Sequence, residues 1–408
     1  MSRTAPQVVF GPGVIEAVPD VVARHGKRVL VCTDTFLSAT ASFQWLLDKL
    51  DDCCESVTLF DQAEPELPLS LVAKVEQVGR ASHIDVVLGY GGGSVIDLAK
   101  VAAVVITLPG DVERFYGEQM IKKEVIPVIA VPTTAGSGSE VTPVAVIGDH
   151  RRDLKVAVSS DRIIPVAAVV DPDLIVGCPP TVIAHSGADA ICHAVEAFTA
   201  RRFNGAPAGL VGRVFIGKND YSDRMSTEAI ALLTAALLPA VTAPGEIEAL
   251  RDMSLGSLLA GMAFANAGTT AAHALQYPLG ALTKTSHGLG VGLLLPYALV
   301  TAIVAREHEL ATVASLMGLP PEGDRSKQAQ SAVRALRSLM VSAGLPSSLS
   351  EIGVQRSDLP GLANRALKVT RLLNNHATTL SRDQILAVYA AAYRGGDPIH
   401  ELRGAFAT

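Results

Sequence analysis

The stretch VVLGYGGGSVIDLAK, from Val86 to Lys100, combines a short apolar run, three glycines and a segment with helical spacing. A strand, a glycine turn and a helix in direct succession are typical of a parallel α/β sheet that binds a dinucleotide at the turn. Gly91, Gly92 and Gly93 let the backbone turn sharply and approach a ligand closely. We expect a helix from about Ser94, with its N–H groups and positive dipole end directed at a pyrophosphate.

This glycine run differs from the G-x-G-x-x-G fingerprint and from the Walker A loop. For the glycines alone, a tight strand-to-helix turn without a ligand is therefore an equally good interpretation. Asp97 lies in the same motif, and we include it among the candidate cofactor-binding residues.

The flanking sequence extends the α/β pattern toward the N-terminus. Apolar runs that read as strands alternate with helical spacing over Thr40–Leu50 and Ser70–Arg80, and these runs are Arg28–Asp34, Glu55–Asp61, Ile84–Tyr90, Val125–Pro132 and Val166–Pro172. Short apolar runs separated by helices indicate parallel strands with crossover connections. Beyond about residue 180 the spacing is almost entirely helical. We therefore predict a Rossmann-like α/β dinucleotide-binding domain over residues 1–180 and an all-α domain over residues 181–408.

Two segments of the second half need separate interpretations. The apolar run Leu289–Ala305 is interrupted by Pro296, which predicts a pair of buried helices and not a membrane span. The glycine-rich segment Arg201–Asp223 has no periodicity and predicts a long loop.

Composition excludes several classes of function. The 408 residues are 49% hydrophobic and 18% charged, with a net charge of −6, so we expect a folded protein that binds neither nucleic acid nor a membrane surface. The first residues do not form a secretory signal pattern. The five cysteines have no zinc-type spacing, which favours a reducing, cytoplasmic location.

Further cofactor candidates follow two other strands. Asp34 ends the first predicted strand of the glycine-loop unit, where an acidic residue can accept from ribose hydroxyls and repel a 2′-phosphate, favouring NAD over NADP. An Asp that caps the next turn is an equally good interpretation. The loop Val131–Pro143 is rich in hydroxyl side chains that could bind a polar cofactor, among them Thr133, Thr134, Ser137 and Thr142.

A second constellation suggests a metal site. In GADAICHAVEAF, Asp189 and His193 are four residues apart and share one helix face. By itself such a pair is more often a structural hydrogen bond than a metal site. His273 and His287 change this balance, because buried imidazoles need partners and a metal ion would pair all four groups. One carboxylate and three imidazoles suit Fe²⁺ or Zn²⁺, and an open coordination position could hold a substrate oxygen.

Four motifs together, GGGSVIDLAK, PTTAGSGSEVT, GADAICHAVEAF and HALQYPLGALTKTSHG, resemble the iron-containing (group III) alcohol dehydrogenases over nearly the whole chain. The resemblance implies a dinucleotide-binding domain, a helical domain, an active site in the cleft between them, and a homodimer. It also implies reversible oxidation of a small alcohol to an aldehyde or ketone with NAD. Its metal ligands fall on Asp189, His193, His273 and His287.

The resemblance places the pyrophosphate loop on residues 91–94 and the cofactor-site threonines on Thr133 and Thr134. It places the NAD-selecting residue on Asp34, and Lys155 matches a cofactor-side lysine less closely. Many members have a substrate-side histidine where this chain has Tyr277, so a tyrosine hydroxyl would take its place, and we include Tyr277 and His287 as catalytic candidates. The change to Tyr297 and the longer Arg201–Asp223 loop would also lie near the substrate.

Three other interpretations stay open at the level of sequence. A lyase of the dehydroquinate synthase type would need a basic cluster for its acidic substrate, and the helical half offers mainly Lys284 near the motifs. A maleylacetate-reductase-like enzyme would work without the metal set. A non-catalytic NAD-binding scaffold would not need four intact ligand positions.

Overall fold

The structure is a computed structural model that describes residues 4–149, 151, 154–205, 209, 212–243 and 245–406. Its described residues form two compact units, one within Met1–Val176 and Ala206–Val214 and the other within Gly177–Gly205 and Phe215–Thr408. Each unit is considered by itself below.

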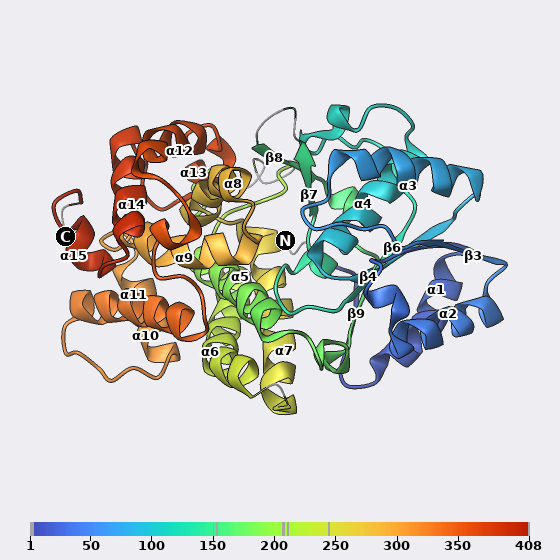
Figure 1. The fold of residues 1–408 in the computed structure, drawn as a ribbon, viewed down its shortest axis with the longest axis horizontal. Coiled ribbons are helices and arrows are strands. Elements are labelled where there is room, and N and C mark those ends of the chain that lie inside the picture. The colour runs from blue at the N-terminus through green and yellow to red at the C-terminus, as the bar shows by residue number, and fades with distance from the viewer. Residues whose placement is uncertain are drawn as a thin grey trace. The chain divides into compact units, whose positions relative to one another are not determined.

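The first unit is built on a six-stranded sheet (Figure 1). In spatial order the strands are β1 (Gln7–Phe10), β9 (Ala167–Val170), β6 (Val128–Pro132), β4 (Val86–Gly91), β2 (Arg28–Cys32) and β3 (Ser56–Phe60). Every pair of neighbours is parallel. This confirms the predicted fold class. Four of the six strands lie within the apolar runs identified from the sequence, and β4 ends one residue beyond its run.

Both faces of this sheet are covered, which explains why its strands are continuously apolar. Leu30 and Val87 pack on one side in a core with residues of α3 (Leu69–Ala81) and α4 (Gly93–Thr107). Val29 and Val86, one position earlier on each strand, pack on the opposite side with α1 (Val18–His25) and α2 (Ala41–Cys53). Figure 1 shows the two helix pairs on opposite faces of the strands.

A smaller sheet in the first unit was not predicted. It contains β5 (Gly117–Glu118), β8 (Leu154–Ser159) and β7 (Val144–Asp149), with β7 and β8 antiparallel. The half-buried positions Val144 and Val146 of β7 are as apolar as its buried positions Ala145 and Ile147, so the sequence shows no polar alternation.

The second unit is helical. Its helices are α5 (Pro180–Thr199), α6 (Asp220–Thr242), α7 (Ile247–Ala267), α8 (Ala271–Thr283), α9 (His287–Val300), α10 (Glu307–Leu316), α11 (Arg325–Ser342), α12 (Leu359–Ala366), α13 (Thr370–Asn375), α14 (Arg382–Arg394) and α15 (Pro398–Leu402). Helix α6 is long and apolar enough to cross a membrane, but it packs against α5 and α7 as a core helix does.

Two predictions for this unit were wrong in detail. The segment expected to form a helix pair is one helix, α9, which continues through Pro296 and ends at Val300. The expected long loop ends at Asn219, whose side chain caps α6, so Asp220–Asp223 are helical. Part of that segment, 206–208 with 210 and 211, lies outside the described residues.

Candidate functional site

Helix α5 presents Asp189 and His193 on one buried face, as their spacing predicted. Both side chains are at least 90% buried. His193 Nε2 lies 3.7 Å from Asp189 Oδ1. The His193 ring also stacks on Phe264 of α7, with centroids 4.1 Å apart and planes at 19°, which holds the imidazole edge toward the carboxylate.

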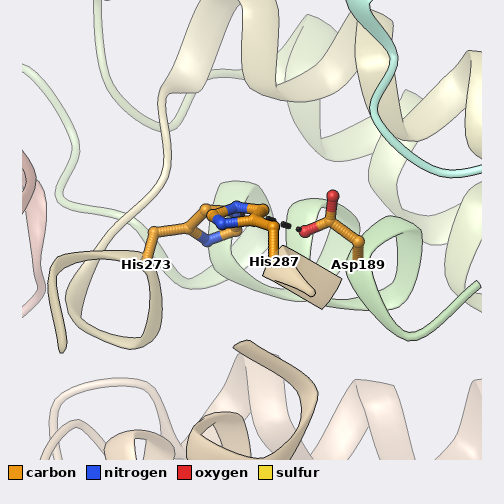
Figure 2. A group of neighbouring side chains, drawn as sticks. All are labelled: Asp189, His273 and His287. Carbon is orange, nitrogen blue, oxygen red and sulfur yellow. Dashed lines mark ion pairs between the residues drawn. The ribbon is translucent and has the colours of Figure 1, made fainter. Parts of the chain in front are cut away.

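Two other helices bring histidines to the same carboxylate oxygen. His273 Nε2 of α8 lies 3.5 Å from Asp189 Oδ1, and His287 Nε2, on the first residue of α9, lies 3.7 Å from it. Figure 2 shows both rings beside Asp189. One potential ligand atom from each of these three residues lies within 4.8 Å of the others. The fold thus brings together all four residues that the sequence singled out for a metal.

The polar atoms of this cluster fit a divalent metal ion. Asp189 Oδ1 and His273 Nε2 are buried, and neither has a hydrogen-bond partner among the described residues. Buried polar atoms are normally paired, so two such atoms facing each other indicate that a further group belongs between them. Three imidazole nitrogens and one carboxylate oxygen are ligands that Fe²⁺ and Zn²⁺ accept.

The three histidines of the cluster favour the ionised form of the Asp189 side chain. Burial raises the pKa of Asp189, but His193, His287 and His273 outweigh it and hold the pKa below its usual range. Asp189 is therefore ionised and available to a cation.

A second carboxylate, Glu196, holds His273 from behind. His273 Nδ1 lies 2.5 Å from Glu196 Oε2, while Glu196 Oε1 accepts from Thr270 Oγ1 and the backbone N–H of Ala272, both at 2.7 Å. Glu196 is buried, and although burial opposes it, His273 lowers the pKa of Glu196. A carboxylate on Nδ1 leaves Nε2 to act as the ligand. Glu196 follows Asp189 by two helical turns, a spacing that signals a shared face, but the sequence does not identify its partner.

His287 has a different partner, the amide of Gln276. His287 Nδ1 lies 2.9 Å from Gln276 Oε1. The His287 side chain is 28% exposed, against 4% for His273, so it marks the more open side of the cluster.

The position of His287 depends on the glycine that follows it. A Cβ on Gly288 would overlap the carbonyl oxygen of His185 and lie 3.1 Å from Asp189 Cβ. Further along α9, a Cβ on Gly292 would lie 2.9 Å from Ala188 Cβ. Helix α9 can therefore approach the backbone of α5 only because these positions have no side chain.

The two tyrosines that distinguish the chain have different surroundings. The Tyr277 ring centroid lies 6.3 Å from that of His287, so Tyr277 is next to the candidate metal ligands. Tyr297 is buried, and its hydroxyl donates to Gly396 O at 3.0 Å and accepts from Arg337 Nε at 3.3 Å. Ten residues of helix, about 15 Å, separate Tyr297 from His287, so Tyr297 is not next to the candidate metal ligands as Tyr277 is.

In the first unit, the predicted glycine loop joins β4 to α4 and packs against the second loop. A Cβ on Gly93 would lie 2.7 Å from Ser137, and one on Gly92 would lie 3.5 Å from Thr134. No side chain caps the N-terminus of α4. Since none of the three glycines has a positive φ, close approach explains them better than unusual dihedral angles.

A buried lysine that the sequence analysis missed organises the second loop. Lys100 Nζ donates to Ser139 Oγ and Thr142 O at 2.9 Å, to Thr142 Oγ1 at 3.2 Å and to Val144 O at 2.8 Å. Asp97 accepts from Ser139 Oγ at 2.5 Å and from the N–H of Val146 at 2.8 Å. Burial lowers the pKa of Lys100 to about 8.

This network changes the interpretation of two cofactor candidates. Both carboxylate oxygens of Asp97 and the hydroxyl of Thr142 form hydrogen bonds within the protein. They would therefore affect a cofactor indirectly, by setting the conformation of the loop Val131–Pro143. The signal in the sequence is the pair Asp97 and Lys100, three residues apart on an otherwise apolar helix.

Two further cofactor candidates, Asp34 and Lys155, have partners within the first unit. Asp34 Oδ1 accepts from the N–H groups of Phe36 and Leu37, each at 2.9 Å, which is the turn-capping geometry. Its second oxygen is not part of that turn. Lys155 forms an ion pair with Glu66, whose N–H donates to Ser94 Oγ at 3.1 Å, so Lys155 is linked to the glycine loop through one residue.

Two family descriptions match the chain. "Iron-containing alcohol dehydrogenase" matches residues 5–172, and "Fe-containing alcohol dehydrogenase family, C-terminal" matches residues 183–393. The two matches together extend over most of the chain.

Individual relatives agree with these matches. The chain is 33% identical over 388 residues to long-chain-alcohol dehydrogenase 1 of Geobacillus thermodenitrificans, with 93% of each chain covered. It is 30% identical to the NAD-dependent methanol dehydrogenase of Bacillus methanolicus, covering 89% of this chain and 92% of that one. The solved structure of a 1,3-propanediol oxidoreductase is similar with a TM-score of 0.90 at 30% identity, covering 96% of this chain and 99% of the other.

Proposed function

The chain belongs to the iron-containing alcohol dehydrogenase family, and we propose that it is a metal-dependent oxidoreductase that exchanges a hydride between NAD(H) and a small alcohol/aldehyde or alcohol/ketone pair. The observation that carries this proposal is the cluster of His193, His273 and His287 around one oxygen of Asp189. Its cofactors are NAD and Fe²⁺, with Zn²⁺ as the alternative metal.

Each residue of the cluster has a distinct task in this proposal. Asp189 supplies the negative charge, and the three imidazoles supply neutral nitrogen ligands. Glu196 keeps the His273 proton on Nδ1 and so leaves Nε2 available. A divalent ion held here would polarise the oxygen of the alcohol or carbonyl substrate.

The substrate would enter beside His287, the most exposed of the four residues. The Tyr277 ring lies 6.3 Å from the His287 ring, and its hydroxyl could exchange a proton with the substrate. The relatives' names range from methanol to long-chain alcohols, so their substrates do not define the substrate of this chain.

For the cofactor, we propose that the N-terminus of α4 binds the pyrophosphate of NAD, with Gly91–Ser94 forming the loop beneath it. Thr133, Thr134 and Ser137 would line the site, and Lys155 would face it from β8. Asp34 would select NAD over NADP by repelling a 2′-phosphate.

The experiment that tests the function is metal analysis of anaerobically purified protein, combined with NADH formation on primary alcohols, diols and hydroxy acids. We expect about one iron or zinc per chain and alcohol-dependent NADH formation. Turnover without metal, unchanged after Fe²⁺ or Zn²⁺ is added, would instead favour the maleylacetate-reductase-like alternative. Bound metal without turnover on any alcohol would favour a non-catalytic role.

We also propose a cytoplasmic homodimer. The five cysteines are all free thiols in the structure, which suits a reducing compartment. Strands β1 and β3 are the edges of the large sheet, and such edges are commonly covered by a partner. Sedimentation equilibrium would test the dimer, and a mass equal to one chain at micromolar concentration would contradict it.

A further inference from the structure

The partners of His273 and His287 differ in charge. Among the described residues, the Glu196 carboxylate has three hydrogen-bond contacts, whereas the neutral side-chain amide of Gln276 has one, to His287. An anionic partner raises the basicity of a histidine ligand more than an amide does. The two imidazoles would therefore hold a metal ion unequally.

Gln276 is in a position that favours an apolar side chain. It is fully buried, and its Nε2 has no hydrogen-bond partner among the described residues. A buried amide with unpaired N–H groups destabilises the fold relative to an apolar side chain of similar shape. A role in the site would explain why a glutamine is present.

Two glycines make room for this amide. A Cβ on Gly280 of α8 would lie 2.7 Å from Gln276 Nε2, and a Cβ on Gly290 of α9 would lie 2.9 Å from Gln276 Cγ. The side chain is thus confined between the two helices that carry His273 and His287. Confinement on both sides directs Oε1 at His287 Nδ1.

We propose that Gln276 is a positioning residue that fixes the orientation and tautomer of His287. When Oε1 accepts the proton on Nδ1, the Nε2 atom facing Asp189 carries the free electron pair and becomes the ligand. Because this partner is neutral, His287 is the more weakly donating of the two ligands, and the metal is left more electrophilic toward a substrate oxygen. This inference rests on the proposed metal site.

The test measures metal affinity directly, without turnover. Co²⁺ is titrated into metal-free wild-type protein and its variants in competition with a chelator, and the visible spectrum reports coordination. We expect Gln276→Leu to weaken Co²⁺ binding by about 10- to 100-fold, while the metal-free protein keeps or increases its thermal midpoint. We expect Gln276→Glu to bind Co²⁺ at least as tightly as the wild type, because the glutamate carboxylate accepts the same proton from His287 Nδ1.

The matched control is Gln328→Leu, another buried glutamine of the same unit, whose Oε1 accepts from Glu322 N at 2.6 Å. It should leave Co²⁺ affinity unchanged. Equal affinity in wild type and Gln276→Leu would overturn the role of Gln276 alone. Absence of Co²⁺ binding by the wild type would overturn both this inference and the metal site beneath it.

Discussion

At the scale of single residues, the site depends on charge and hydrogen-bond pairing. Asp189 has three imidazoles around one oxygen, so removal of any one ring changes the candidate ligand set. His273 is the ring most tightly held, because it is buried and bonded to Glu196.

Replacement of His273 by Ala should abolish metal retention and turnover but leave NAD binding intact. The reason is that the variant loses one metal-binding side chain in the second unit, whereas the glycine loop in the first unit is unchanged. Metal content by mass spectrometry and NADH binding by fluorescence would check this. His308→Ala, at an exposed histidine of α10, is the control. Full activity in His273→Ala would show that the metal assignment is wrong.

The preference for NAD over NADP should depend on the single residue Asp34. Asp34→Asn keeps the oxygen that caps the turn to Phe36 and Leu37 but removes the charge. The ratio of kcat/KM for NADP to that for NAD should then rise on the order of tenfold, the effect of roughly 1.4 kcal/mol. An unchanged ratio in steady-state kinetics would contradict a selecting role.

The buried histidine His376 gives the protein a defined response to acid. Burial lowers the pKa of His376 from 6.5 to about 4, and Arg201 and Arg306 add to the effect. Between these two values the native state binds fewer protons than the unfolded state. The stability supplied by the neutral ring is therefore complete above pH 6.5 and is lost as the pH falls toward 4.

This loss should amount to at most about 3 kcal/mol and should shrink in His376→Gln, whose amide can still donate to Thr301. Urea unfolding of both proteins at several pH values between 4 and 7 measures it. Parallel pH profiles for the two proteins would show that another group controls acid stability.

At the scale of elements, the site exists because α9 begins against the backbone of α5. Gly288 permits this contact, since a Cβ there would overlap His185 O. The same principle operates in the first unit, where Gly93 lets the first turn of α4 meet Ser137.

Replacement of Gly288 by Ala should move the start of α9 and displace His287. We expect a loss of about 1–3 kcal/mol in the free energy of unfolding, typical of overpacking, together with weaker metal binding. Gly361→Ala in α12 is the matched control, because no neighbouring atom lies within 4 Å of its added Cβ. Thermal unfolding with and without Zn²⁺ separates the two effects. A Gly288→Ala protein that binds metal like wild type would show that the close approach is unnecessary.

In the whole molecule, the candidate sites for the metal and for NAD lie in different units. The four metal candidates lie in the second unit, and the glycine loop lies in the first. The metal ion should therefore stabilise the second unit most directly, and NAD the first, because each binds only the folded form.

Hydrogen exchange measured by mass spectrometry should show this division. Fe²⁺ or Zn²⁺ should protect amides of α5, α8 and the start of α9, and NAD should protect the β4–α4 turn and the loop Val131–Pro143. In His273→Ala, the protection by metal should be lost and the protection by NAD should remain. Protection of the glycine loop by metal alone would contradict the assignment of separate sites.

Features that depend on local periodicity and composition could be predicted before the structure was known. The change from alternating strands and helices to continuous helical spacing predicted the α/β and all-α parts. The spacing of Asp189 and His193 predicted a shared helix face. The sequence did not predict strand β7, because apolar residues occupy its half-buried positions as well as its buried positions Ala145 and Ile147.

Which distant side chains meet became clear from the folded structure alone. It brought His273 and His287 to Asp189, paired Glu196 with His273 and Gln276 with His287, and placed Tyr297 against Gly396 instead of next to the candidate metal ligands. These contacts depend on how closely helices pack, and close packing depends on glycines such as Gly288 and Gly290 at points of contact. Spacing along the chain specifies the face of a helix, whereas the partner of that face is specified by the packing of elements far apart in sequence.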